Sequence, residues 1–163
     1  MTKATRRTRV RAPETPVRAA LKPESPLKAM VKDGFGAIIK PHRIHFDEDV
    51  RPSFVDSLDA DQALQPGREQ ENRWDYLLGH GPSGKIIGVE PHSAENSEIK
   101  TVIKKLESAR RQLRDHLQDG TVVSRWFWVP SGKVHFAPLE KARLQLAQNG
   151  IDFVNKITNK HLK

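Results

Sequence analysis

Apolar side chains recur at helical spacing through residues 95–118. The apolar positions, three and four residues apart, are Ile99, Val102, Ile103, Leu106, Ala109, Leu113 and Leu117. This single stripe is typical of an amphipathic helix that packs one face against a core. Residues 121–129, TVVSRWFWV, are apolar on both faces, which indicates a strand inside a sheet. A second helix is expected over residues 138–148 and a last strand over residues 151–157.

Two β-rich runs precede the first of these helices, RWDYLLG at residues 73–79 and KIIGVEPH at residues 85–92. The GHGPSG between them is a turn sequence, so the runs predict a hairpin. The turn also matches the phosphate-binding pattern G-x-x-x-x-G-K, but Ile86 stands where that pattern needs Ser or Thr, which favours the hairpin. The order strand, strand, helix, strand, helix, strand predicts an α/β fold with a mixed β-sheet flanked by helices.

The alternation of side chains indicates the register of this hairpin. A turn centred on residues 82–83 places Asp75 opposite Glu90. It also places Arg73 opposite His92. One face then presents an apolar set, Trp74, Tyr76, Leu78, Ile87 and Val89, and the other face presents Asp75, Leu77, Gly88, Glu90 and His92. A slip of one residue would mix the two sets, so the pattern favours this register.

Patterns in the first half of the chain are weaker. Ser25-Pro26 is a start signal for a short helix over residues 27–32. Residues 37–46 are partly β-like, although their proline favours an edge or a break. A further helix is expected across residues 54–64.

The basic charge of the chain is concentrated at its N-terminus. The 163 residues include 28 Lys and Arg against 20 Asp and Glu, a net charge of +8. Residues 1–43 hold eleven basic and three acidic side chains, so they account for the whole excess. We therefore expect two parts: a basic, proline-containing, extended arm over residues 1–35 and a single α/β domain over residues 36–163. Such an arm binds polyanions in a salt-dependent way, and its candidate contacts are Arg6, Arg7, Arg9 and Arg11, with Lys100 and Lys104 on the long helix.

Composition excludes several other classes of protein. The chain has no Cys, so disulfides and Cys-ligated zinc or iron–sulfur sites are absent. No apolar run reaches the ~18–20 residues of a membrane span, and no apolar stretch follows the charged N-terminus as in a secretory signal. These features predict a soluble, cytoplasmic protein.

The two opposed carboxylates of the hairpin need a positive charge between them. Facing carboxylates repel each other, which destabilises a strand pair. A divalent cation is one solution, because carboxylate oxygens and water suit Mg²⁺ or Mn²⁺. The other is a solvated sheet edge at which Arg73 or a lysine neutralises Asp75 and Glu90.

This arrangement resembles the PD-(D/E)xK nuclease superfamily. The similarity lies in Asp75 at the start of one strand, Glu90-Pro91-His92 at the end of the next, and the helix and strand that follow, which together cover about residues 73–129. The resemblance implies a restriction-endonuclease-like core in which Asp75 and Glu90 bind Mg²⁺ or Mn²⁺. His92 occupies the position of the family's lysine. An imidazole there can orient water or act as a base, but it lacks a permanent charge.

The resemblance implies metal-dependent hydrolysis of phosphodiesters in DNA or RNA, with Asp75, Glu90 and His92 as the catalytic residues. One alternative is a non-catalytic nucleic-acid-binding or assembly subunit of the same fold that uses its basic arm. Another is a protein whose arm is ordered by an acidic protein partner.

Overall fold

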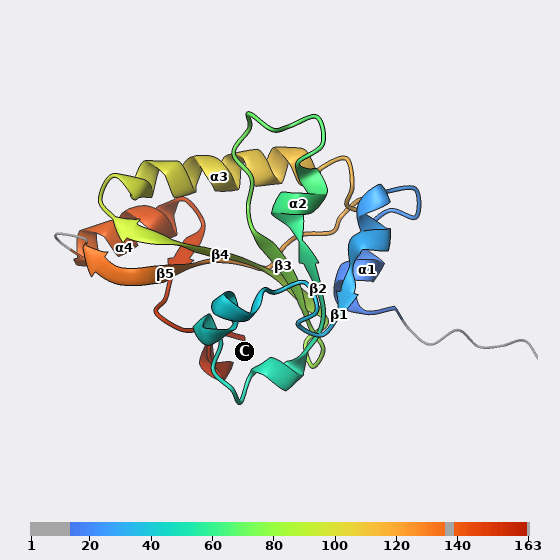
Figure 1. Cartoon of the computed structure of the whole chain (residues 1–163), viewed down its shortest axis with the longest axis horizontal. Helices are drawn as coiled ribbons and strands as arrows, with labels where there is room; N and C mark the ends of the chain where they lie inside the picture. Colours follow the sequence, from blue (N-terminus) through green and yellow to red (C-terminus); the bar gives the residue numbers. More distant parts are fainter. Residues whose placement is uncertain (1–13, 136–138, 163) are drawn as a thin grey trace, which may run out of the picture.

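The computed structural model describes residues 14–135 and 139–162 and is built on one six-stranded mixed sheet in the order β1-β2-β3-β4-β5-β6 (Figure 1). The strands are β1 (Lys32–Asp33), β2 (Phe54–Asp59), β3 (Tyr76–His80), β4 (Lys85–Glu95), β5 (Arg125–His135) and β6 (Ile151–Phe153). The α-helices are α1 (Pro16–Ala20), α2 (Ala60–Leu64), α3 (Glu98–Leu113) and α4 (Leu139–Gln148). Short 3-10 helices are η1 (Pro26–Met30), η2 (Lys40–His45), η3 (Arg51–Ser53) and η4 (Asn159–Leu162).

The predicted hairpin and its register are confirmed. Strands β3 and β4 are antiparallel, and Tyr76 pairs with Val89 as the predicted register requires. Gly79–Lys85 therefore forms the end of a hairpin and not a phosphate-binding loop. The same register continued by one residue brings Asp75 beside Glu90.

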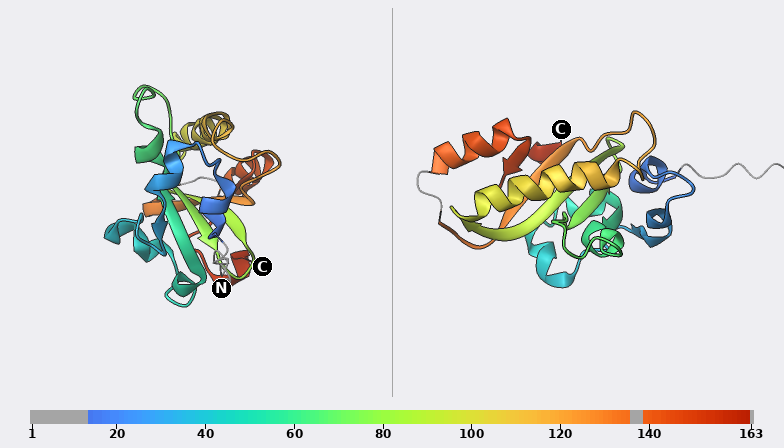
Figure 2. Two further views of the ribbon diagram at one scale, coloured as in Figure 1. Left: turned by 90° about the vertical axis from the view of Figure 1, so that its right-hand side faces the viewer. Right: turned by 90° about the horizontal axis from the view of Figure 1, so that it is seen from above.

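The second half of the predicted order is also confirmed. Helix α3 connects β4 to β5, helix α4 connects β5 to β6, and both strand pairs are parallel. Helices α3 and α4 lie side by side on one face of the sheet (Figure 2). The mixed sheet thus combines an antiparallel part, β1 to β4, with a parallel part, β4 to β6.

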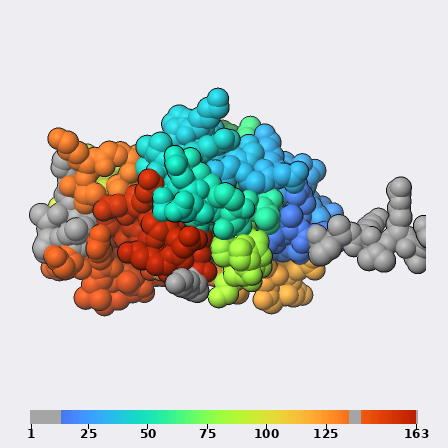
Figure 3. Space-filling view, turned by 90° about the horizontal axis from the view of Figure 1, so that it is seen from below, coloured from blue at the N-terminus to red at the C-terminus, as the bar shows by residue number. Residues whose placement is uncertain are grey.

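Both faces of the sheet are buried, whereas the hairpin pattern predicted an apolar core on only one of its faces. The face beneath the α-helices buries Leu77, Trp126 and Trp128. The opposite face buries Tyr76, Leu78 and their neighbours beneath residues 35–53 and the C-terminal segment. Figure 3 shows that C-terminal segment lying against the segment that includes η2 and η3. The hairpin face that carries Glu90 is therefore a helix-covered interior.

Trp74 lies on the other face from the one predicted. It belongs to the core beneath the helices, where its ring packs edge-on against Trp126 at 5.2 Å. The prediction extended strand alternation back to residue 74, but β3 begins only at Tyr76. Alternation of faces applies only within a strand, so it does not place Trp74.

Two predictions for the first half of the chain are wrong. Residues 54–64 are not one helix: β2 occupies the first six residues, and α2 begins at Ala60 after Asp59 caps it by accepting the Gln62 N–H at 2.9 Å. Residues 37–46 contain η2 and no strand. The proline of that segment stands in the first turn of η2, where its missing N–H and fixed φ are tolerated.

The extended arm predicted for residues 1–35 is wrong for residues 14–35. Helix α1 buries Val17, and Leu21 and Leu27 belong to the core beneath the helices. The carboxylate of Asp56 on β2 accepts the Val17 and Arg18 backbone N–H groups at 2.9 and 3.1 Å, which fixes the start of α1 on the sheet. Arg6, Arg7, Arg9 and Arg11 lie outside the described residues. Within the described ranges, no helix has both the length and the hydropathy that a membrane span requires.

Candidate functional site

Asp75, Glu90 and a lysine of helix α3 meet beneath that helix. Asp75 immediately precedes β3, and its backbone N–H donates to Glu90 Oε2 at 2.8 Å. The other oxygen of Glu90, Oε1, pairs with Lys105 Nζ. The Glu90 side chain is fully buried, whereas that of Lys105 is 18% exposed. The hairpin and the crossover helix thus bring two carboxylates and one ammonium to the same place.

His92 lies at the rim of this cluster. Its Nε2 is 2.7 Å from Glu98 Oε2 at the beginning of α3, and its Nδ1 is 3.7 Å from Glu90 Oε1. Its carbonyl accepts the Trp128 indole N–H at 3.1 Å, which holds this part of β4 against β5. The imidazole therefore stands between a buried carboxylate and a partly exposed one.

Burial shifts both central carboxyl groups toward their protonated forms. It raises the pKa of Asp75 to about 6, with Asp61 and Asp59 adding to the rise and Lys105 opposing it. It raises the pKa of Glu90 to about 8, with Asp75 adding to the rise and Lys105 opposing it. Burial is the largest cause of both shifts, so each carboxyl group holds its proton more tightly here than in water.

Lys105 keeps its proton in this environment. Burial alone would lower the pKa of its ammonium, but attraction to Glu90 and Asp75 outweighs burial and the pKa lies above its usual value. The ammonium is thus a fixed positive charge beside the two carboxyl groups.

Of the two neutralising groups expected at a solvated edge, the structure selects a lysine and excludes Arg73. Arg73 pairs with Asp61 at 2.9 Å and donates to the carbonyls of Arg68 and Glu71. Its guanidinium is therefore committed to the loop before β3. The expected solvated edge is also wrong, because Glu90 is buried.

The sequence pattern places Lys105 on the polar side of the long helix but does not identify it as the partner of Glu90. It singled out Lys100 and Lys104, which are exposed on α3 and make no ion pair with the carboxylates among the described residues. Lys105 follows Val102 by three positions and precedes Leu106, so it borders the apolar stripe of the helix. Its place beside the stripe, on a helix expected to pack over the strand that carries Glu90, is the feature of the sequence that could have indicated this ion pair.

Asp75 and Glu90 offer carboxylate oxygens, the donor type of a hard divalent cation, but Lys105 occupies one oxygen of Glu90. Mg²⁺ is commonly bound by one or two carboxylates, with water and substrate phosphate completing its coordination. Across the described residues, the Asp75 side chain accepts no hydrogen bond, so its oxygens are available. Glu90 Oε1 is available only if Lys105 turns aside. In the part of the chain that the structure describes, no group of three or more acidic or histidine side chains is arranged to hold a metal by itself.

Comparisons with family models, with curated proteins and with solved structures found no match to this chain. The fold defines the class of protein as α/β with a six-stranded mixed sheet. The functional argument therefore rests on the geometry of the cluster formed by Asp75, Glu90, His92 and Lys105.

Proposed function

We propose that the protein is a divalent-metal-dependent phosphodiesterase of the PD-(D/E)xK type that acts on nucleic acid. The observation that carries this proposal is the closeness of Asp75, Glu90 and Lys105. Glu90 accepts the Asp75 backbone N–H and pairs with Lys105, and the Asp75 carboxyl group lies near enough to influence the pKa of both partners. The mutual repulsion of the two carboxyl groups, which adds to the burial that raises the pKa of Glu90, is consistent with it, because a cation between them would relieve that repulsion.

Each side chain has a role that follows from its position. Asp75 and Glu90 would hold Mg²⁺ or Mn²⁺, which supplies a polarised phosphate and a bound water of lowered pKa. Lys105 supplies the permanent charge that the imidazole of His92 lacks, and its ammonium can stabilise charge on a phosphate oxygen. His92, held by Glu98, is placed to accept or return a proton at its Nδ1.

Cleavage of nucleic acid tests the proposal directly. The full chain is incubated with plasmid and with single-stranded oligonucleotides at several Mg²⁺ and Mn²⁺ concentrations. Asp75→Asn and Glu90→Gln are each expected to lower metal-dependent cleavage at least about 100-fold, the scale seen when a group that stabilises developing charge is lost. Glu107→Gln, an exposed glutamate on the same helix, is the matched control and should cleave like the unchanged protein. Equal cleavage by all three variants, or none by the unchanged protein with either metal, would refute an enzymatic role.

A second function is favoured by one observation at the same site. Both oxygens of the buried Glu90 are already satisfied, by Lys105 and by the Asp75 N–H. A closed ion pair of this kind suits a non-catalytic subunit that binds nucleic acid through its basic residues, Arg6, Arg7, Arg9 and Arg11 among them. Salt-sensitive binding without cleavage at any metal concentration would select this function over the first.

A further inference from the structure

A small cavity lies where the end of the β3–β4 hairpin meets the C-terminal segment. Its volume is about 100 Å³, the share of about three water molecules and less than the sites of drug-sized ligands occupy. In Figure 3 the end of the hairpin, in yellow-green, lies beside the C-terminal segment, in red. Among the described residues that line the cavity, none is acidic and six have side chains that form hydrogen bonds: His80, Ser83, Lys85, Ser124, Arg125 and His161.

Strand register brings three of these side chains to one place on the sheet. His80 pairs directly with Lys85 at the end of the hairpin, and Arg125 pairs with Ile87 between the parallel strands β4 and β5. Directly paired residues share a face and have Cβ atoms about 5 Å apart, and residues two positions apart on one strand share that face as well. Ile87 belongs to the core on the face that the C-terminal segment covers. The three side chains therefore project from neighbouring positions toward that segment.

Hydrogen bonds in the walls hold the polar side chains in two sets. On the hairpin, Ser83 Oγ accepts the Lys85 backbone N–H at 3.2 Å and lies 2.7 Å from His80 Nδ1. On the opposite wall, one Nη of Arg125 donates to the carbonyl of His161. The fold thus positions both sets without a ligand.

The imidazole of His161 presents a hydrogen-bond donor. The Thr158 backbone N–H donates to its Nδ1 at 3.0 Å, so the neutral ring carries its own proton on Nε2. The Phe127 ring packs edge-on against this imidazole at 5.9 Å, which helps to fix its plane. His80 also uses its Nδ1 within the protein, and its Nε2 makes no hydrogen bond with a described residue. A protonated Nε2 suits an anion and not a metal ion, which needs the lone pair of that nitrogen.

The walls carry positive charge that the protein does not fully neutralise. Lys85 is exposed and makes no ion pair with a described residue. Arg125 pairs with Asp152 through Nε at 3.0 Å, which leaves its second Nη without a partner among the described residues. Burial lowers the pKa of His161, and the positive charges of Lys160 and Arg125 lower it further. The Asp152 carboxylate opposes this fall in pKa with a smaller effect.

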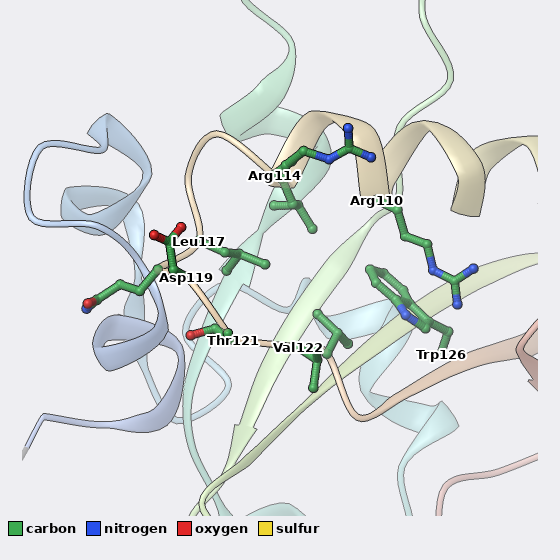
Figure 4. Close-up of a pocket in the computed structure, with 11 residues that line it drawn as sticks. Arg110, Arg114, Leu117, Asp119, Thr121, Val122 and Trp126 are labelled. Atoms are coloured by element: carbon green, nitrogen blue, oxygen red, sulfur yellow. The ribbon is translucent and has the colours of Figure 1, made fainter.

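The larger cavity at the end of helix α3 does not bring donors together in this way. Its volume is about 430 Å³, and in Figure 4 Arg110 and Arg114 extend from the helix in different directions. Its Trp126 is 5% exposed, so little of that ring is open to a ligand. The grouping of donors, and not volume, therefore distinguishes the small cavity.

We infer that the small cavity binds a phosphate group whose oxygens accept hydrogen bonds from Lys85, Arg125 and His161. Hydrogen bonds from charged donors to phosphate oxygens are stronger than those between neutral groups. A phosphate has enough oxygens for all three donors, whereas a carboxylate has only two. The chemistry is the same for inorganic phosphate and for the phosphate at the end of a nucleotide chain.

This inference gives the turn between β3 and β4 a role that differs from the phosphate-binding pattern in its sequence. The turn contributes the side chains of His80 and Lys85, and not backbone N–H groups at the beginning of a helix. Asp75 precedes β3 at its other end, about 16 Å from His80 along an extended strand. The inference therefore does not rest on the proposed cleavage.

An NMR titration of the full chain with inorganic phosphate, in buffer without divalent metal, tests the inference. The ring signals of His80 and His161 should shift to saturation with a dissociation constant below about 1 mM. Those of His42 and His116, which do not line the cavity, should stay in place. Sodium chloride at equal ionic strength should not reproduce the shifts. Asp75→Asn should bind phosphate like the unchanged protein, so this result and loss of cleavage are independent.

Substitution of the exposed lysine tests the contact itself. Lys85→Gln should weaken phosphate binding about tenfold, the usual effect of losing a hydrogen bond to a charged group. Lys156→Gln is the matched control, because it removes the same charge from an exposed position of the C-terminal segment outside the cavity wall. Circular dichroism checks that both variants are folded, which their exposed positions favour. The inference is overturned if the shifts of His80 and His161 do not saturate in this range, or if Lys85→Gln binds phosphate like Lys156→Gln.

The source of the phosphate is decided by a 5′-phosphorylated dinucleotide and the same dinucleotide without its terminal phosphate. Tighter binding of the phosphorylated dinucleotide than of inorganic phosphate identifies the end of a nucleotide chain. Equal or weaker binding identifies free phosphate. Equal shifts of His80 and His161 with the unphosphorylated dinucleotide would also overturn the inference, because the terminal phosphate would then not be the group that is recognised.

Discussion

Glu90 shows how one residue depends on both strand register and helix position. A glutamate alone on a buried sheet face would be strongly destabilising, because burial of a charge is costly without a partner. The register places the Asp75 N–H on one of its oxygens, and α3 places Lys105 on the other. Through alternation, the sequence predicts that Asp75 lies opposite Glu90, which makes the first contact possible, but not the hydrogen bond itself. It does not predict the second, because periodicity gives the apolar face of a helix but not its rotation and height over a particular strand.

The stability of the free protein should depend on the protonation of this site. The folded state raises the pKa of Asp75 and Glu90 to about 6 and about 8, above their ordinary values of 3.8 and 4.5. The folded state therefore binds more protons at these groups than the unfolded state, and their contribution to the free energy of unfolding falls as pH rises from about 4 to about 8. Urea unfolding in EDTA at pH 5 and pH 8 measures the change.

The double variant Asp75→Asn/Glu90→Gln isolates this contribution from other groups. Burial lowers the pKa of several histidines, His42, His45, His80, His116 and His161, which gives the opposite slope near pH 6.5. Between pH 5 and pH 8, the unchanged protein should lose more stability, or gain less, than the double variant. Parallel profiles for the two proteins would show that these carboxyl groups are not shifted.

At the scale of elements, the parallel half of the sheet was predictable and the antiparallel edge was not. Helix α3 has a long single apolar stripe and β5 contains a long apolar run. Their local patterns and their tertiary packing favour the same secondary structure, so both elements can be predicted from the sequence. Strand β2 is followed directly by α2, with Asp59 both the last strand residue and the helix N-cap, and the pattern of the combined segment predicts a single helix. Helix α1 has five residues and holds its place through Asp56, 39 positions away from Val17. A contact of that sequence separation leaves no local pattern.

The junction of α1 with the sheet depends on the absence of a side chain at Gly79. A Cβ atom there would overlap Asp56 Oδ1 and lie 3.0 Å from Pro16 Cβ. Gly79→Ala should therefore destabilise the protein by about 2 kcal/mol or more, through overpacking and displacement of the carboxylate. Asp56→Ala should cost about 1.5–3 kcal/mol, because it leaves buried backbone N–H groups without their charged acceptor.

Urea unfolding of the two single variants and the double variant tests this account of the junction. The double variant Asp56→Ala/Gly79→Ala removes the atoms that the new methyl group would overlap. Its loss of stability should be smaller than the sum of the two single losses, by about 1 kcal/mol. Additive losses would mean that Gly79 and Asp56 act independently.

At the scale of the whole molecule, the candidate site and the N-terminal segment belong to different ends of β3. Asp75 precedes the first residue of the strand, whereas α1 packs near its other end, beside Gly79. Residues 14–31 are part of the folded core, so a deletion that removes basic charge without unfolding the domain has to stop at residue 13. Residues 1–13 contain five basic residues and no acidic one: Lys3, Arg6, Arg7, Arg9 and Arg11.

Deleting residues 1–13 should weaken binding to nucleic acid without removing chemistry. Each phosphate contact contributes about 0.9 to the slope of log affinity against log salt for duplex DNA, so loss of up to five contacts should reduce that slope by at most about 4.5. Metal-dependent cleavage should persist at low salt, because Asp75, Glu90 and Lys105 remain in place. The salt slope of binding and the rate of cleavage are measured on one labelled duplex over a roughly tenfold range of salt, about 20 to 200 mM. Cleavage lost at every salt concentration, with the domain still folded, would instead assign the N-terminal residues a direct part in the reaction.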